Sequence, residues 1–296
     1  MVLADGVHAA FAAGAVAALA RRGVRWDRGA GAGLGAQVAL LGLLGDAEEA
    51  ERRWARQGEL GCPMFESRVG AARRRVAAVA GVTVLTDAGS APGWLDPAGL
   101  AEHLEPESAD VPRRLAARGA SLNVAVEDAG SGTRAWCDLA RVAAARAGAL
   151  LRAAAAFPGG WGPEEVREGE RSERLWGGTS AALQGAPPWG PGSGEWDAVC
   201  GFPVPASPRS ALGGSLLELI QRRSEIECAA WVASLGECRI AVVAPTASEY
   251  EAWSGRPGAD LGVEYPLPWE RNGALTAALV RFGAFAAGER GAKPPE

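Results

Sequence analysis

Residues 24–36 read VRWDRGAGAGLGA, and the run GAGLGA from Gly31 to Ala36 decides how we interpret the fold. A short strand-like stretch precedes the alternating glycines, and a stretch rich in alanine, leucine and valine follows them. This succession predicts a strand, a tight glycine turn and a helix that extends from Ala36 to Gln57. Because the start of a helix presents free backbone N–H groups, the turn is a candidate site for negative charge.

A similar succession opens the chain. Val2 to Ala4 predicts a strand, and the alanine-rich run from Ala9 to Arg22 predicts a helix that stops at Gly23. Further strands are expected over 82–86, 122–127 and 240–244, and further helices over 97–104, 112–118 and 138–156. The alternation predicts a single α/β domain over residues 1–296, built in three layers from a mainly parallel sheet with helices on both faces.

Composition weighs against several classes of function. The 296 residues carry 30 basic and 35 acidic side chains, and a net charge of −5 has the wrong sign for binding nucleic acid over a large surface. The five cysteines form no C-x-x-C pair, and His8 and His103 lie far apart, so we expect neither a metal site nor a cofactor. The apolar run from Ala9 to Ala20 is too short to span a bilayer and wrongly flanked for a signal peptide, which predicts a cytoplasmic protein without a transmembrane segment.

Residues 157–214 break the alternation of strands and helices. They are dense in proline, glycine and tryptophan, and they include Trp161, Trp176, Trp189 and Trp196. Such a composition predicts mostly irregular structure. We expect this segment to act as a lid over part of the domain.

The order of these segments resembles the patatin-like phospholipase family. AAFAAG (9–14) is similar to the family's first helix, and GAGLGA (31–36) falls where the family has its G-x-S-x-G nucleophile elbow. Later strand and loop signatures of the family are resembled by LTDAGSAPGWLDPAGLAEHL (85–104), LNVAVEDAGSG (122–132) and RAAAAFPGGWGP (152–163). The resemblance implies an α/β fold and places the family's dyad aspartate at Asp197, which is followed by Ala198 instead of the usual glycine.

The serine that this resemblance implies is absent. The elbow chemistry needs a serine on the tight turn, where its hydroxyl stands in front of a helix N-terminus. That position is Gly33, and no serine, threonine or tyrosine occurs before Ser67. The family's oxyanion loop is matched only by Asp5, Gly6 and His8, and a carboxylate at Asp5 would repel a developing oxyanion.

These losses predict a patatin-like protein that has no hydrolase activity. Such a protein would serve as a scaffold, binding either a protein partner, for instance an active paralogue, or a lipid-like or acyl ligand in the former acyl pocket. The resemblance implies no cofactor.

Two other interpretations stay open. GTSAA (178–182) looks like a displaced elbow, and Ser180 with Asp197 would then make the chain an active acyl hydrolase, phospholipase or acyltransferase, although we expect no strand before it and no helix after it. GAGLGA (31–36) also fits the dinucleotide-binding pattern G-x-G-x-x-A. The acidic residue that this pattern needs would fall in residues 50–57, which predict a helix and not the end of a second strand.

Overall fold

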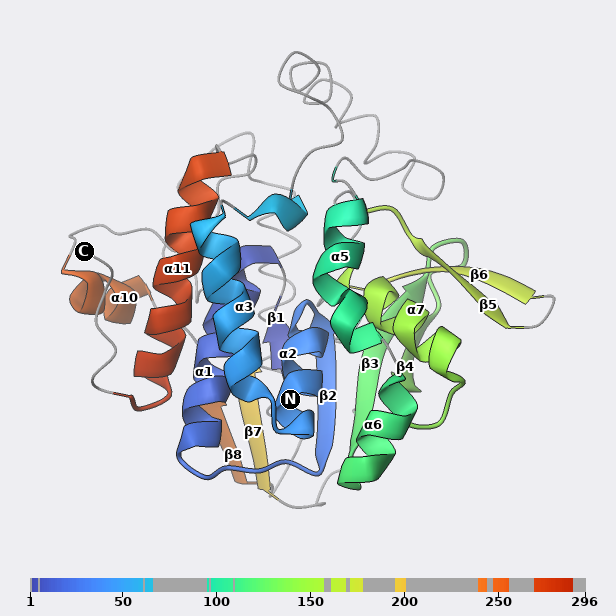
Figure 1. The fold of residues 1–296 in the computed structure, drawn as a ribbon, viewed down its shortest axis with the longest axis horizontal. Helices are drawn as coiled ribbons and strands as arrows, with labels where there is room; N and C mark the ends of the chain where they lie inside the picture. The colour runs from blue at the N-terminus through green and yellow to red at the C-terminus, as the bar shows by residue number, and fades with distance from the viewer. Residues whose placement is uncertain are drawn as a thin grey trace, which may run out of the picture.

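The computed structural model shows an α/β fold in which helices pack against one mixed sheet (Figure 1). It describes residues 2–4, 6–60, 62–65, 95, 97–108, 110–156, 161–168, 171–177, 195–200, 239–243, 247–255 and 269–289.

The strands are β1 (Val2–Ala4), β2 (Arg28–Gly33), β3 (Ser121–Asp128), β4 (Arg134–Asp138), β5 (Glu164–Glu168), β6 (Arg171–Trp176), β7 (Glu195–Cys200) and β8 (Arg239–Val243). The α-helices are α1 (Ala9–Arg21), α2 (Gly35–Leu44), α3 (Ala47–Glu59), α5 (Pro97–Ser108), α6 (Val111–Arg118), α7 (Ala144–Ala155), α10 (Ala247–Ser254) and α11 (Trp269–Ala286). Two short 3₁₀ helices, η1 (Gly6–His8) and η2 (Pro63–Phe65), complete the described elements.

The sheet has a parallel centre and an antiparallel flank. Five strands run parallel in the order β3-β2-β1-β7-β8, which agrees with the predicted α/β alternation. Around β3, β4 pairs antiparallel along the edge opposite β2, β6 pairs antiparallel with Glu127 and Asp128 at the end of β3, and β5 pairs antiparallel with β6. The sheet is therefore mixed, because two hairpins, β3-β4 and β5-β6, whose connections can be short, add antiparallel strands around β3.

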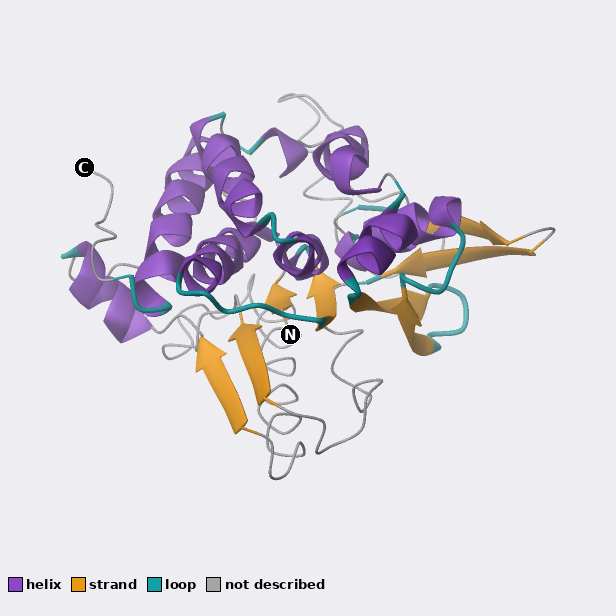
Figure 2. Cartoon of the chain, turned by 60° about the horizontal axis from the view of Figure 1, so that its bottom comes forward, coloured by secondary structure: helices purple, strands orange, loops and turns teal. Residues whose placement is uncertain are grey.

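Figure 2 shows α1, α2, α3, α5, α7 and α11 gathered on one face of the sheet. Every residue of α1 from Ala9 to Leu19 is buried, since α1 lies between the sheet and α11. Glycines let these two helices touch backbone to backbone: a Cβ on Gly14 would lie 1.9 Å from the Val280 carbonyl oxygen, and one on Gly283 would lie 2.0 Å from that of Phe11. The second helical layer that the alternation predicts is not found among the described residues.

Several predicted boundaries differ from the structure. The helix expected over 36–57 is two helices, because Gly45 adopts a left-handed φ of 78° and ends α2. The helix expected over 138–156 begins only at Ala144, since 134–138 pair with β3 as a strand. The segment 157–214, expected to be mostly irregular, contains β5, β6 and β7. The strand expected over 82–86 lies outside the described residues.

Candidate functional site

The turn between β2 and α2 has the form of an elbow. The strand ends at Gly33, Leu34 occupies the N-cap position, and the helix begins at Gly35. Gly33 has a φ of 60°, in the left-handed region that glycine enters freely and other residues enter at a cost. A strand that turns into a helix over so few residues places Gly33 at the tip.

The glycines on either side of the tip are required by close contacts. A Cβ on Gly31 would lie 2.4 Å from the Cα of Ala36, because the first turn of α2 folds back onto β2. A Cβ on Gly35 would lie 2.8 Å from both the amide nitrogen of Ala4 and the carbonyl oxygen of Val2, because the helix start also presses on β1. The alternating glycines thus serve one purpose, which is to hold the N-terminus of α2 against two strands.

Three segments meet at this end of the sheet. Gly33 is level with Ala4 of β1, and Leu3 of β1 is level with Cys200, the last residue of β7. The chain moves outward from β1 on one side through β2 and β3 and on the other through β7 and β8, so β1 lies where the strand order reverses. In open α/β sheets such a point, at the carboxyl ends of the strands, is where ligands bind.

Of the three residues predicted for an oxyanion loop, the structure describes Gly6 and His8. Gly6 has a positive φ of 53° in η1, and the His8 side chain is buried at the start of α1. Asp5 lies outside the described residues. The structure therefore places Gly6 and His8 next to the elbow's end of β1 and leaves the expectation for Asp5 as a prediction.

Asp197 does not lie at the elbow. Val199 is level with Val2, and Val2 is level with Gly31, so Asp197 stands level with Gly29, four residues before Gly33 along the strands. At the usual rise of a strand this is about 13 Å toward the amino-terminal end of the sheet. The dyad role predicted for Asp197 needs it beside Gly33, and the register does not bring the two together.

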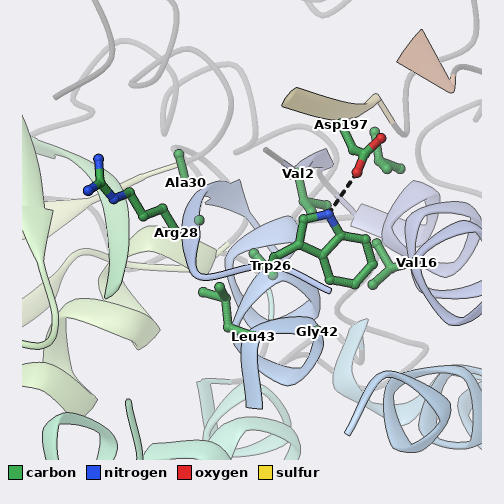
Figure 3. Close-up of a pocket in the computed structure, with 11 residues that line it drawn as sticks. Val2, Val16, Trp26, Arg28, Ala30, Gly42, Leu43 and Asp197 are labelled. Atoms are coloured by element: carbon green, nitrogen blue, oxygen red, sulfur yellow. Dashed lines mark hydrogen bonds between the residues drawn. The ribbon is translucent and has the colours of Figure 1, made fainter. Parts of the chain in front are cut away.

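The surroundings of Asp197 are those of a packed side chain (Figure 3). The indole Nε1 of Trp26 donates a 2.9 Å hydrogen bond to Oδ2 of Asp197. Val2, Val16 and Leu43 help to line a cavity of about 30 Å³ beside this pair. That volume is enough for about one water molecule and far below the several hundred Å³ of an ordinary ligand pocket.

For the displaced elbow predicted around Ser180, the structure describes only the residues that precede it, up to Gly177. Ser180 itself lies outside the described residues. The expectation that no strand precedes it is wrong, because residues 171–176 form β6 and pair with β5 and β3. The residues 50–57 discussed for nucleotide binding lie in α3, a helix, as predicted.

A buried polar cluster beside the first turns of α2 was not foreseen. His103 of α5 approaches Gln37 of α2, with 2.8 Å from Nε2 to Oε1, and Gln57 of α3, with 3.3 Å from Nδ1 to Nε2. Burial, helped by the positive charge of Arg53, lowers the pKa of His103 to about 3. The Gln57 amide then donates to Nδ1, the neutral imidazole donates from Nε2 to Gln37, and the cluster joins three helices.

The described residues also bear on metals and membranes. Among them there is no group of three or more histidine, cysteine or acidic side chains that could hold a metal ion. None of the helices in the described ranges is long and apolar enough to cross a membrane.

Comparison with models of known protein families gives no match, and no curated protein matches the chain significantly.

Two features of the site escaped sequence reasoning. Cys200, and not Asp197, is the residue that reaches the carboxyl end of β7. The strand-like run EWDAVC before Gly201 was the available signal, since a strand that ends there carries Asp197 back toward its start. The partnership of Trp26 with Asp197 joins segments 171 residues apart and had no signal in the sequence.

Proposed function

We propose that this chain is a patatin-like protein that does not hydrolyse esters and acts instead as a binding scaffold. The observation that carries the proposal is Gly33: the tip of an elbow-shaped turn, in front of the N-terminus of α2, is a residue without a side chain. A turn of this form serves acyl transfer only when its tip carries a nucleophile.

The conformation of Gly33 supports a scaffold that no longer needs the nucleophile. A serine held at a φ near 60° stores backbone strain of about 1–2 kcal/mol, and an enzyme tolerates that strain because the hydroxyl must be exposed. Glycine removes the strain and keeps the turn. Glycine in place of a serine at this position therefore stabilises the fold, and nothing opposes the change once catalysis is no longer required.

The position of Asp197 points the same way. Its carboxylate accepts a hydrogen bond from Trp26 at the amino-terminal end of the sheet, so it ties the loop before β2 to β7 and lies away from the elbow. The 30 Å³ cavity beside it has no room for an acyl chain. This end of the sheet therefore offers no cavity for an acyl ligand among the described residues.

The proposal is tested by labelling the purified protein with a fluorophosphonate probe, which reacts with activated serines. We expect no labelling above that of the heat-denatured protein, while a serine esterase treated in parallel is labelled fully. Stoichiometric labelling of the native chain would contradict the proposal.

The alternative of an active hydrolase at Ser180 is supported by the strand β6 that precedes this residue. It makes a separate prediction for the same experiment. Labelling that disappears in Ser180→Ala but persists in a Ser131→Ala control, altered in the loop after β3, would establish Ser180 as the nucleophile.

A further inference from the structure

The sheet ends at β5, whose outer edge is unpaired within the described part of the chain. Among the described strands β5 pairs with β6 alone, and the two form a hairpin that projects from the domain beside α7 (Figure 1). Val166, in the middle of β5, is fully buried against the domain. Its neighbours Glu165 and Arg167 point to the opposite face, with 52% and 73% of their side chains exposed, and they form an ion pair with each other at 3.0 Å.

The register of the hairpin shows which backbone groups face outward. Glu168 is opposite Arg171, and only two residues lie between them, so this pair closes the hairpin with mutual hydrogen bonds. Hydrogen-bonded and non-hydrogen-bonded pairs alternate along an antiparallel ladder. The N–H and C=O groups of Glu164, Val166 and Glu168 thus face β6. Those of Glu165 and Arg167 face away from the sheet, and no strand in the described ranges pairs with them.

On the exposed face of β5, the ion-paired Glu165 and Arg167 are arranged so that a second, antiparallel copy would place an opposite charge across from each of them. A two-fold axis through Val166 would set Glu165 opposite Arg167 of the partner subunit, and the reverse pair follows by symmetry. Each of these pairs would exchange two backbone hydrogen bonds and bring opposite charges together on the exposed face. Charged side chains on an edge strand usually prevent pairing with another chain. Glu165 and Arg167, placed symmetrically about Val166, instead favour the pairing of one copy of β5 with a second copy.

The same register sets Glu164 opposite Glu168 of the partner subunit. This like-charge contact is weakened because Arg152 of α7 already holds Glu164, with 2.8 Å and 2.6 Å from its Nε and Nη2 to Oε1. The ladder is short and buries little apolar surface, which predicts a weak dimer with a dissociation constant in the micromolar range or above.

We infer that the partner for this edge is a second copy of the chain, bound through antiparallel pairing of β5 with β5 about Val166. The two eight-stranded sheets become one continuous sheet across the dimer. The inference does not depend on whether the elbow is catalytic.

Sedimentation velocity from low micromolar to millimolar concentration tests the inference, because each subunit has a mass of 30.4 kDa and the dimer is easily separated. We expect concentration-dependent dimers of the wild type. Arg167→Glu sets glutamate against glutamate in both symmetric pairs and should raise the dissociation constant about tenfold or more, as should Glu165→Arg. Arg52→Glu, on the exposed surface of α3, serves as the charge-matched control and should dimerise as the wild type does.

Mixing the two variants shows whether weaker dimerisation comes from charge repulsion at the interface or from a damaged hairpin. In a heterodimer of the Arg167→Glu chain with the Glu165→Arg chain, both cross-strand pairs again join opposite charges. The mixture, with one chain fluorescently labelled, should therefore associate about as strongly as the wild type. A wild type that stays monomeric over the whole range, or a mixture no stronger than either variant alone, would overturn the inference.

Discussion

Trp26 and Asp197 are joined by a 2.9 Å hydrogen bond from the indole Nε1 to the carboxylate, although 171 residues separate them in sequence. The bond ties the loop before β2 to β7 at the amino-terminal end of the sheet. It gives Asp197 a structural role, four residues below the elbow along the strands.

Removing this acceptor should therefore affect stability. Asp197→Ala leaves the partly buried Trp26 N–H without its partner and should lower the free energy of unfolding by about 1–2 kcal/mol in denaturant titrations. Asp197→Asn keeps an acceptor oxygen of the same shape and should lose less than half as much. Equal losses for the two variants would show that charge, and not the hydrogen bond, is what matters.

The left-handed conformation of Gly33 predicts the order of substitutions at the elbow. Gly33→Ala and Gly33→Ser should each cost about 1–2 kcal/mol in unfolding free energy, because the strain comes from the backbone and is the same for both. Asparagine tolerates this region better, so Gly33→Asn should cost less. Thermal unfolding of the three variants checks the order, and a serine variant as stable as the wild type would be evidence against the strained elbow.

The contact between α1 and α11 should be intolerant of a single methyl group. Gly14→Ala drives a Cβ into the Val280 carbonyl oxygen and Gly283→Ala drives one into that of Phe11, so each should destabilise the protein by at least about 2–3 kcal/mol. Gly42→Ala is the matched control, since its Cβ would meet side chains and no backbone: a methyl of Val16 at 3.1 Å, which can adjust, and the ring of Trp26 at 3.5 Å, an ordinary contact. Chemical unfolding of the three variants compares them directly.

The buried His103 predicts how stability depends on pH. Its pKa is about 3 in the folded protein and 6.5 when unfolded, so between these values the unfolded chain binds the extra proton. The stabilisation is complete above about pH 6.5 and falls as the pH is lowered toward 3, by up to about 1.4 kcal/mol per pH unit. His103→Gln has no such titration. The difference in unfolding free energy between wild type and His103→Gln should therefore shrink on acidification, and a difference independent of pH would contradict the burial of a neutral imidazole.

The first third of the described fold could be predicted because its signals are local. Glycines 31, 33 and 35 mark a turn whose neighbours along the chain are also its neighbours in space, and the strand, turn and helix around it are present. The break at Gly45 also has a local signal, a glycine before an aspartate, which the long run of helix formers outweighed.

The rest of the site could not be predicted, because it depends on the register in which the strands pair, and a single sequence does not reveal that register. Asp197 and Cys200 are three residues apart on the same strand, and only the pairing of β7 with β1 shows which of them reaches the elbow end. The hairpin of β5 and β6 was hidden for a different reason. Its strands are short and highly charged, and they stand among glycines and tryptophans in a segment whose composition predicts irregular structure.

The elbow of this chain carries no nucleophile, and hydrolysis of short-chain p-nitrophenyl esters tests the proposed lack of activity most directly. Purified wild type, Ser180→Ala and Asp197→Ala should all release p-nitrophenol at the rate of buffer alone, while a serine esterase assayed in parallel turns the esters over. Turnover by the wild type that is abolished in Ser180→Ala or Asp197→Ala would contradict the account and locate an active site that Gly33 does not provide.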